Sequence, residues 1–204
     1  MKKLDIIKNY YEPHLNEDLP DYQILGWESK EAQFQRFKIL TDHIEVDSHK
    51  ILDVGCGLGN LLEHLNDHKG EPIYTGVDIL EHMIEKARKK YPEADFHHMD
   101  IFAEKHFEDN SFDTIYSSGI FNINMGNNYD FLKDAIRLFL RLAQENVVFN
   151  LLHHHSPDRD ETYYYFHPDE VIKMIEDLND NSLTSIKIVE HYLKNDFTII
   201  LEKR

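Results

Sequence analysis

From about residue 50 to the end of the chain, short apolar runs alternate with longer stretches in which apolar residues recur every three or four positions. A short apolar run between turn residues is typical of a buried strand, and the longer spacing is typical of a helix with one buried face. Their alternation predicts an α/β fold with a parallel sheet and crossover helices. The predicted strands cover residues 51–54, 73–77, 95–98, 113–117, 146–152, 186–190 and 197–201.

Each helix predicted between these strands carries one apolar stripe. Pro168 suits the first turn of the last helix, where Asp169 and Glu170 favour the positive end of the helix dipole. The final two strands are joined by a polar link at 194–196 that is too short for a crossover helix, so we expect an antiparallel hairpin. The stripes mark helices over residues 58–65, 80–87, 131–142 and 171–178.

The first 50 residues do not follow this alternation. We expect an extended segment from Tyr10 to a turn at Gly26, and then a helix capped by Ser29 with apolar residues at 34, 37, 40 and 44. We therefore divide the chain into an N-terminal extension, 1–48, whose helix packs on the core as a lid, and a domain over 49–204.

Composition narrows the class of protein. The chain has 204 residues, enough for one well-buried domain, and no apolar run that resembles a membrane span. Lys and Arg number 22 against 38 Asp and Glu, a net charge of −16 that repels a phosphate backbone and disfavours a nucleic-acid partner. The single cysteine excludes an internal disulfide and a thiolate-rich zinc site.

The opening sequence MKKLDIIKNYY has charged residues within its apolar stretch. A secretory signal needs an uninterrupted apolar region after its positive charges. We therefore expect no such signal and a cytoplasmic location, without membrane association.

The sequence ILDVGCGLGN, residues 51–60, is predicted to form a strand, a tight turn and the start of a helix. In an open parallel sheet a ligand binds at this place, against the helix N-terminus. Gly55, Gly57 and Gly59 permit unusual dihedral angles and let a ligand approach the main chain closely. Cys56 lies at a helix N-terminus, where a thiol can become reactive, but no histidine partner is evident and a small buried side chain is the favoured interpretation.

Acidic residues at three successive strand ends indicate the kind of ligand. The dinucleotide fingerprint requires a glycine at position 60, where this chain has Asn60. The negative charge of Asp53 would repel a pyrophosphate, but it can bind a cationic amine. Asp78, nineteen residues beyond Gly59, can accept the two hydroxyls of a ribose, and Asp100 can accept from an adenine amine or cap a helix. The set favours an adenosyl amino acid over a dinucleotide.

On these residues the chain resembles the class I S-adenosylmethionine-dependent methyltransferases. ILDVGCGLGNLLEHL, YTGVDILEHMIEKARKKYP, HHMDIF and FDTIYSSGIFN are similar to four motifs of that family and occur in the same order. The resemblance covers roughly residues 50 to 202, and it implies a three-layer Rossmann-like fold with a seven-stranded, mostly parallel sheet of order 3-2-1-4-5-7-6, strand 7 being antiparallel. The N-terminal DYQILGWESKEAQFQRF further resembles a small bacterial group with no assigned substrate.

Carried over by position, the resemblance implies S-adenosylmethionine as cofactor and S-adenosylhomocysteine as product. It places the methionine end at Asp53 and the glycine loop, the ribose at Asp78, and adenine near Asp100. Trp27 and Arg36 could close over the cofactor or dock the N-terminal helix on the core. The cofactor-binding residues that we predict are Asp53, Gly55, Cys56, Gly57, Gly59, Asp78, Ile79, Met83, Asp100, Ile101, Ser118, Trp27 and Arg36.

The methyl acceptor is expected beside the ends of the fourth and fifth predicted strands. Asn122, His153 and Tyr165 are the candidate substrate residues, and a purely structural Asn122 is an equal alternative. The sequence at Asn122 is neither NPPY nor DPPY, which weakens a nucleic-acid base as acceptor. His153 and His155 have a spacing found among metal ligands, but no third ligand is evident, so we expect a solvated loop and no metal.

Methyl transfer from a sulfonium depends chiefly on alignment of the reacting atoms. A general base is required only for an acceptor that starts protonated, so we assign none; His153, His167 and Tyr165 are the candidates. We expect a methyltransferase acting on a small molecule, in an unknown oligomeric state. The alternatives are a cofactor-binding module without turnover, acting as a sensor or partner protein, and a nicotinamide-dependent oxidoreductase, which Asp53 and Asn60 disfavour.

Overall fold

The computed structural model describes residues 3–15, 18–67, 71–103 and 105–204. Residues 1–2 and 16–17 of the predicted N-terminal extension lie outside this description. The elements are α1 Lys3–Leu15, α2 Asp21–Ile24, α3 Lys30–His43, β1 Lys50–Val54, α4 Asn60–Asn66, β2 Ile73–Asp78, α5 Glu81–Lys90, β3 Asp95–His98, β4 Phe112–Ser117, α6 Asn128–Leu142, β5 Ala143–Leu152, α7 Pro168–Glu176, β6 Leu183–Val189 and β7 Asp196–Lys203.

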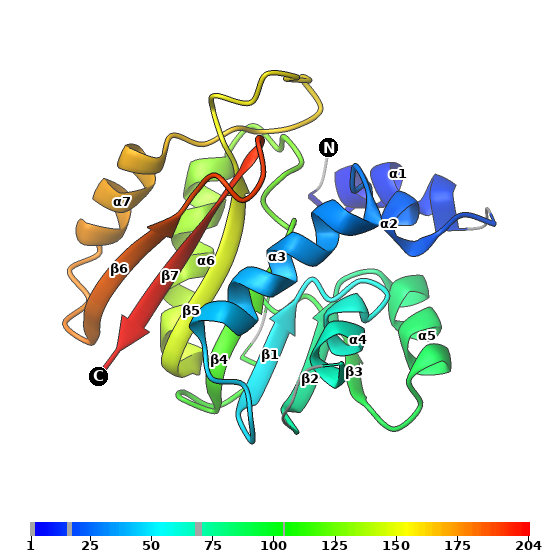
Figure 1. The fold of residues 1–204 in the computed structure, drawn as a ribbon, viewed down its shortest axis with the longest axis horizontal. Helices are drawn as coiled ribbons and strands as arrows, with labels where there is room; N and C mark the ends of the chain where they lie inside the picture. Colours follow the sequence, from blue (N-terminus) through cyan, green and yellow to red (C-terminus); the bar gives the residue numbers. More distant parts are fainter. Residues whose placement is uncertain (1–2, 16–17, 68–70, 104) are drawn as a thin grey trace.

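The strands form one seven-stranded sheet of order β3-β2-β1-β4-β5-β7-β6 (Figure 1). Strands β1 to β5 pair in parallel, and β7 is antiparallel to both β5 and β6. The predicted order, the terminal hairpin and the reversed strand 7 are all confirmed. The order changes direction between β1 and β4, and an open sheet has its crevice at such a switch point, beyond the carboxyl ends of the strands.

Helices cover both faces of the sheet and complete three layers (Figure 1). Apolar residues of α3, α4 and α5 join Ile51 and Val148 in one buried cluster. Residues of α6 and α7, including Phe139 and Ile175, pack with Ile115 in the cluster on the other face. Because β1 and β4 contribute to both clusters, their side chains are buried on both sides, which accounts for their continuous apolar sequences.

The N-terminal segment differs from the prediction. We expected an extended segment from Tyr10 to Gly26, but α1 and α2 occupy much of it. Leu4, Ile7, Tyr11 and Leu15 repeat at helical spacing and pack in a third cluster, which also contains apolar residues of α2, of the loop before α4 and of α5. Pro13 obscured this pattern, although a proline in the last turn of α1 still leaves most of the helix intact.

The helix predicted after Gly26 is α3, and Ser29 caps it as expected. The Ser29 side chain accepts a hydrogen bond from the Ala32 N–H at 3.0 Å. Phe34, however, is 42% exposed, although it was expected on the buried face of this helix. In the part of the chain that the structure describes, no helix has the length and apolar character needed to cross a bilayer.

Candidate functional site

A cavity lies where β1, β2 and β4 end, beneath the N-terminal helices. Its floor is formed by the ends of these strands and by the loop that follows β1. Its cover comes from α1, from the segment after α2 and from α3, which contribute Lys3, Ile7, Tyr11, Leu25, Trp27, Gln33 and Phe37. The site thus brings together residues from both parts into which the sequence was divided.

The loop after β1 is held at the edge of the sheet by β2. The N–H groups of Gly55 and Cys56 both donate to the Val77 carbonyl oxygen, at 2.8 and 3.0 Å. Gly55 and Gly57 have φ values of +79° and +52°, which L side chains rarely adopt. The local sequence therefore allows a turn that exposes its main chain to the cavity.

There is no space for a side chain at Gly55 or Gly57 of this loop. A Cβ atom on Gly55 would lie 2.2 Å from Ile120 Cγ2, and one on Gly57 would lie 2.7 Å from Leu25 Cδ2. Gly119, at the end of β4, is equally close to Trp27, since a Cβ there would meet the indole at 2.8 Å. Apolar side chains of the cover and of the β4 end thus lie directly on bare main chain.

Asp78 links the glycine loop to the second strand. One carboxylate oxygen accepts the Gly57 N–H at 3.0 Å, and the other accepts the Leu80 N–H at 2.8 Å. Burial raises the pKa of Asp78 above its ordinary value, and the Leu80 and Gly57 N–H groups oppose this shift. The side chain therefore positions the loop, and each oxygen retains a lone pair that can face a ligand.

Asp53 is 4% exposed and lines the cavity. The Tyr74 hydroxyl donates to its Oδ2 atom at 2.9 Å. Burial raises the pKa of Asp53 to about 7, an effect that the Tyr74 hydrogen bond opposes and the charge of Asp78 reinforces. No cation pairs with Asp53 among the described residues, so a cationic ligand group would meet an uncompensated carboxylate.

The other predicted cofactor residues divide into two groups. Ile79, Met83, Asp100, Ile101, Ser118, Trp27 and Cys56 line the cavity with Asp53, Gly55, Gly57 and Asp78. Asp100 also accepts the Phe102 N–H at 3.0 Å, a local turn contact of the capping kind that was the alternative for this residue. Cys56 is buried, and burial raises the pKa of its thiol well above the ordinary value, which favours the interpretation of this cysteine as an unreactive packing residue.

Gly59 and Arg36 do not reach the cavity. A Cβ on Gly59 would meet the Phe96 ring at 2.9 Å, because this glycine faces the core at the start of α4. Arg36 is buried against β7, where its Nε donates to Asp196 Oδ2 at 2.5 Å. Its guanidinium lies 4.3 Å from the centre of the Trp27 ring, so the structure favours docking over ligand contact for Arg36.

The three predicted substrate residues also lie outside the cavity lining. Asn122 accepts the Tyr164 N–H through its main-chain oxygen, and His153 bonds Glu190. The Tyr165 hydroxyl accepts the Asp160 N–H within its own loop. The neighbouring Tyr164 and Phe166 pack against the core, so the aromatic segment after β5 chiefly caps the sheet.

The cover contains site residues that the sequence reasoning missed. Lys3, Ile7 and Tyr11 of α1 line the cavity, and the Lys3 ammonium lies 3.4 Å from the centre of the Phe131 ring. Burial lowers the pKa of Lys3 to about 8, while the charge of Asp100 acts in the opposite direction. The helical spacing of Leu4, Ile7 and Tyr11 was the signal that could have revealed this helix.

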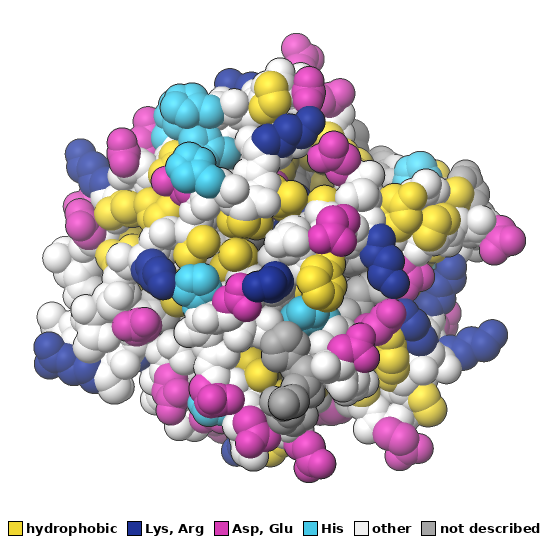
Figure 2. Space-filling model, in the orientation of Figure 1, with side chains coloured by type: hydrophobic (Ala, Val, Ile, Leu, Met, Phe, Trp, Pro, Cys, Tyr) yellow, Lys and Arg dark blue, Asp and Glu magenta, His cyan; other side chains and the backbone are white. Residues whose placement is uncertain are grey.

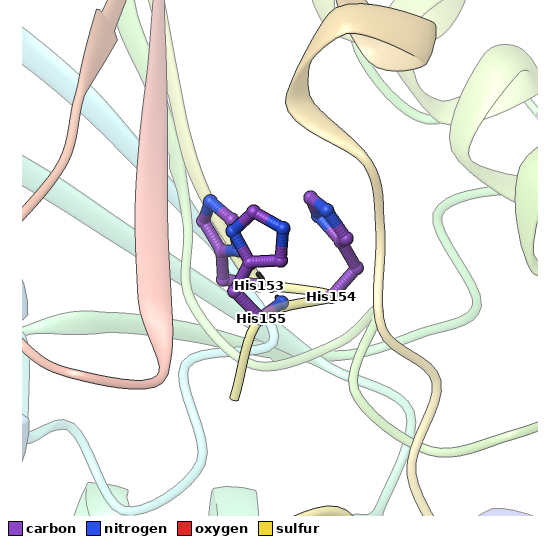
Figure 3. Close-up of side chains that lie close together, drawn as sticks. All are labelled: His153, His154 and His155. Carbon is purple, nitrogen blue, oxygen red and sulfur yellow. Dashed lines mark hydrogen bonds between the residues drawn. The ribbon is translucent and has the colours of Figure 1, made fainter. Parts of the chain in front are cut away.

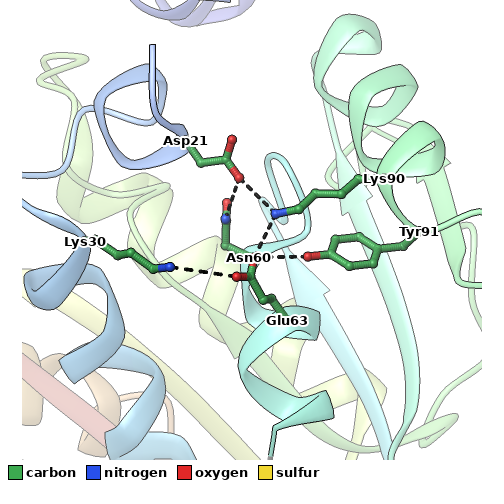
Figure 4. Close-up of polar contacts among 6 residues, drawn as sticks. All are labelled: Asp21, Lys30, Asn60, Glu63, Lys90 and Tyr91. Carbon is green, nitrogen blue, oxygen red and sulfur yellow. Dashed lines mark hydrogen bonds and ion pairs between the residues drawn. The ribbon is translucent and has the colours of Figure 1, made fainter.

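Polar contacts join the cover to the rest of the site along one edge (Figure 4). Asp21 of α2 accepts from the Asn60 side chain at 2.8 Å and from the Lys90 ammonium at 3.1 Å. Lys90 also donates to Glu63 at 2.7 Å, and Lys30 of α3 lies 3.9 Å from Glu63. These partly exposed groups connect α2 and α3 with α4 and α5.

The Tyr10 and Tyr163 hydroxyls form a second connection, at 2.6 Å, between α1 and the loop after β5. Tyr163 also forms an isolated bridge with Ile123, which lines the cavity. These contacts hold the cover on the α5 side and on the β5 side, in addition to the Arg36–Asp196 pair at β7.

In the comparison with known proteins, residues 51–142 match a family model described as methyltransferase domain. The chain is 35% identical over 69 residues to trans-aconitate 2-methyltransferase of Agrobacterium fabrum, which covers 34% of this chain and 26% of that protein. It is 38% identical over 96 residues to demethylmenaquinone methyltransferase of Chlorobaculum parvum, which covers 47% of this chain and 36% of that protein. The alignments therefore span about a quarter to a third of these curated relatives.

The whole chain also matches solved structures. Magnesium protoporphyrin IX methyltransferase of Synechocystis PCC 6803, solved with bound S-adenosylmethionine, superposes with a TM-score of 0.69 at 16% identity. The match covers 100% of this chain and 98% of that one. At this identity the likeness establishes the fold, and it includes α1 and α2, which lie outside the family match.

Proposed function

We propose that this chain, which carries a methyltransferase domain over residues 51–142 in the class I methyltransferase fold, is an S-adenosylmethionine-dependent methyltransferase acting on a small molecule. One observation carries the proposal. The Asp53 carboxylate, which pairs with no cation among the described residues, lies in the cavity beside a loop whose Gly55 and Gly57 have no room for a side chain. Such a cradle suits a ligand that has both an amine and an adenosine.

The residues present fit that cofactor. In our proposal Asp53 and the glycine loop hold its amino-acid end, Asp78 accepts the ribose hydroxyls, and Asp100 with Ile101 lies at adenine. Ser118 supports the fit, because it lines the cavity and its hydroxyl is buried there beside the Tyr116 hydroxyl. When bound, S-adenosylmethionine supplies a methyl group on a positively charged sulfur.

In the proposed reaction, the chain orients the reactants and excludes water. The N-terminal part, 1–48, serves as the lid and the part over 49–204 as the catalytic domain. Trp27 lies against Gly119 and Ile120 lies against Gly55, and both side chains line the cavity and restrict how an acceptor can approach. Orientation of this kind supplies on the order of 7–11 kcal/mol of barrier reduction. None of the candidate bases His153, His167 and Tyr165 lines the cavity, which favours an acceptor that needs no base.

The acceptor is proposed to be small and largely apolar. Ile120, Ile123 and Met125 line the cavity beyond the end of β4, on the side away from Asp78 and Asp100. The relatives reported above are named for aconitate, demethylmenaquinone and a protoporphyrin, each a small molecule. The net charge of −16 disfavours a nucleic acid as the acceptor.

The expected cytoplasmic location stays a prediction, which fractionation of cells would test.

Binding can be measured directly because Trp27 is the chain's only tryptophan and lines the cavity. We expect S-adenosylmethionine and S-adenosylhomocysteine to change its fluorescence with one-to-one stoichiometry, in agreement with calorimetry. Asp78→Ala should weaken both ligands roughly ten- to a hundredfold, because charged hydrogen bonds worth about 1.5–3 kcal/mol are lost. The matched control is Asp134→Ala on the exposed face of α6, which should bind as the parent does.

Three results would count against the proposal. If neither S-adenosylmethionine nor S-adenosylhomocysteine bound at millimolar concentration, the proposed cofactor would be wrong. Binding of NADH instead would indicate an oxidoreductase. Tight binding without formation of S-adenosylhomocysteine, across a broad screen of small acceptors, would indicate a cofactor-binding module without turnover.

A further inference from the structure

Histidines gather at the carboxyl end of β5, away from the cavity. His153, His154 and His155 follow one another in the turn after this strand, and Figure 2 shows histidine side chains together at this end of the molecule. One ring nitrogen from each of the three can be chosen so that all lie within 4.8 Å of one another (Figure 3). We expected no metal here because no third ligand was evident in the sequence, but the fold brings the His154 ring beside the other two.

Backbone hydrogen bonds fix this turn. The His153 N–H donates to Asn195 at 2.7 Å, and the His154 N–H donates to Phe166 at 2.9 Å. The Ser156 N–H then returns to the His153 carbonyl at 2.9 Å and closes the turn. Three consecutive residues thereby present their rings to one side instead of alternating as they would in a strand.

Glu190 orients the first of the three rings. The His153 Nε2 atom lies 3.0 Å from Glu190 Oε1, and His153 Nδ1 accepts the His155 N–H at 3.0 Å. The proton is therefore on Nε2, and the lone pair of Nδ1 points into the cluster. A carboxylate that holds the far nitrogen of a histidine in this way is the usual support of a metal-bound imidazole.

His154 has an unused ligand atom. Its Nδ1 is buried and has no hydrogen-bond partner among the described residues. A buried polar atom without a partner is costly, so such an atom points to a group that would satisfy it. The His154 ring is also held in place, because it stacks on His167 with the ring centres 3.7 Å apart.

We propose that His153, His154 and His155 bind one divalent transition-metal ion of the zinc class, with a fourth position left for water. Three atoms that lie within 4.8 Å of one another are at most about 2.8 Å from a common centre. Zinc–nitrogen bonds of about 2.0–2.1 Å therefore require each ring to move inward by at most roughly 0.7 Å. Rotation of the side chains supplies this movement. When the metal binds, His153 Nδ1 gives up its hydrogen bond from the His155 N–H and coordinates the ion instead.

The donor set selects the kind of metal. Three neutral imidazoles suit zinc, nickel and copper, whereas magnesium and calcium require oxygen ligands. The chain's one cysteine, Cys56, lies in the glycine loop and is not part of this group. The negative field of a chain with net charge −16 favours a cation at any such position.

A bound ion would stiffen the loop that contacts the lid. His154 stacks on His167, which follows the other end of the same loop, and between them Tyr163 bonds Tyr10 of α1. The ion would therefore fix the base of a loop whose middle holds the cover of the cavity. The role proposed for the metal is structural, since the cluster does not line the cavity.

The test uses full-length protein without a histidine tag, stripped with a chelator and dialysed. We expect one zinc ion per chain, bound at micromolar concentration or tighter in competition with a chromophoric chelator, and a higher unfolding temperature with zinc. Cobalt in place of zinc should give visible absorption bands of a four-coordinate site. His154→Ala should weaken zinc at least a hundredfold, and Glu190→Gln roughly tenfold.

The matched control is His82→Ala, which removes an exposed histidine on α5. It should bind zinc as the parent does, and both histidine variants should unfold at the parent's temperature in the presence of chelator. Zinc binding only at millimolar concentration, or equal binding by His154→Ala and His82→Ala, would overturn the proposal. Neither result depends on the cofactor, so this test stands apart from that of the proposed function.

Discussion

Two buried aspartates at the edge of the sheet contrast with each other. Asp53 is the penultimate residue of β1 and is 4% exposed, and Asp196 begins β7 and is 2% exposed. Asp196 accepts hydrogen bonds from Arg36 at 2.5 Å and from Asn150 at 2.8 Å. Asp53 accepts one from the Tyr74 hydroxyl and pairs with no cation among the described residues.

We therefore regard Asp196 as a structural carboxylate and assign Asp53 to ligand binding. The cation for Asp196 comes from α3, so this pair ties the N-terminal helix to the terminal hairpin. Asp53 faces the cavity, and its burial without a cation raises its pKa to about 7. A buried acid that has no counter-charge among the described residues costs stability, and a cationic ligand group at Asp53 would supply the missing charge.

Asp196→Ala should have the largest effect on folding. The substitution leaves the Arg36 guanidinium buried without a counter-charge, and breaking a buried pair in this way costs about 3–5 kcal/mol. Urea denaturation should show the loss, while the protein that stays folded at low temperature should bind S-adenosylmethionine normally. Glu202→Ala, at an exposed position of the same strand, is the control. If folded Asp196→Ala protein no longer bound S-adenosylmethionine, Asp196 would also serve ligand binding, and the distinction between the two aspartates would be wrong.

Gly55→Val should have the largest effect on the Asp53 side. We expect loss of S-adenosylmethionine binding by more than about a hundredfold, because a side chain here would fill the space beside Ile120. Gly126→Val is a matched control, since Gly126 has a similar φ of +80° but nothing within 4 Å of its Cβ position. The backbone cost is then comparable in both variants. Equal binding by the two would argue against close approach of a ligand to the loop.

Asp53→Asn should separate stability from binding. The folded-state pKa of about 7 lies above the unfolded value of 3.8, so the folded protein holds an extra proton between these values and loses stability as pH rises through them. Asparagine removes that cost and should stabilise the ligand-free protein at pH 8 by up to about 4 kcal/mol, the free energy that corresponds to this difference in pKa.

The same substitution should weaken S-adenosylmethionine at pH 8, because asparagine cannot neutralise its amine. At pH 4, where Asp53 is protonated, the stabilities of the two proteins should converge. Thermal unfolding at both pH values, with calorimetry at pH 8, measures both effects. A variant that is less stable than the parent at pH 8 would show that Asp53 is compensated within the protein.

Lys90→Met should have the smallest effect. Lys90 joins Asp21 and Glu63 at the exposed edge in Figure 4, and ion pairs of this kind contribute less than about 1 kcal/mol. We expect a small loss of stability that disappears in high salt, measured by urea denaturation at two salt concentrations. A loss comparable with that of Asp196→Ala would mean that the lid depends as much on this exposed edge as on the buried pair.

The sequence by itself determined the sheet and the three acids beside the glycine loop. Strand length, helical spacing and the glycines act over a few residues, so the order of motifs was enough to predict that Asp53 and Asp78 face one cavity. The acceptor side was less accessible to this reasoning. Asn122, His153 and Tyr165 were chosen by proximity to strand ends, but the turns that follow direct them elsewhere.

Only the tertiary structure decided the partners of side chains that are distant in sequence. Arg36 and Asp196 are 160 positions apart, and no local pattern distinguishes an arginine that binds a ligand from one that pairs within the core. His154 becomes the third member of its cluster because a turn breaks the alternation of β5 and brings its ring beside His167. The spacing of apolar residues determines which face of a helix or strand is buried. Which side chain pairs with a buried charge depends instead on how whole helices and strands pack together.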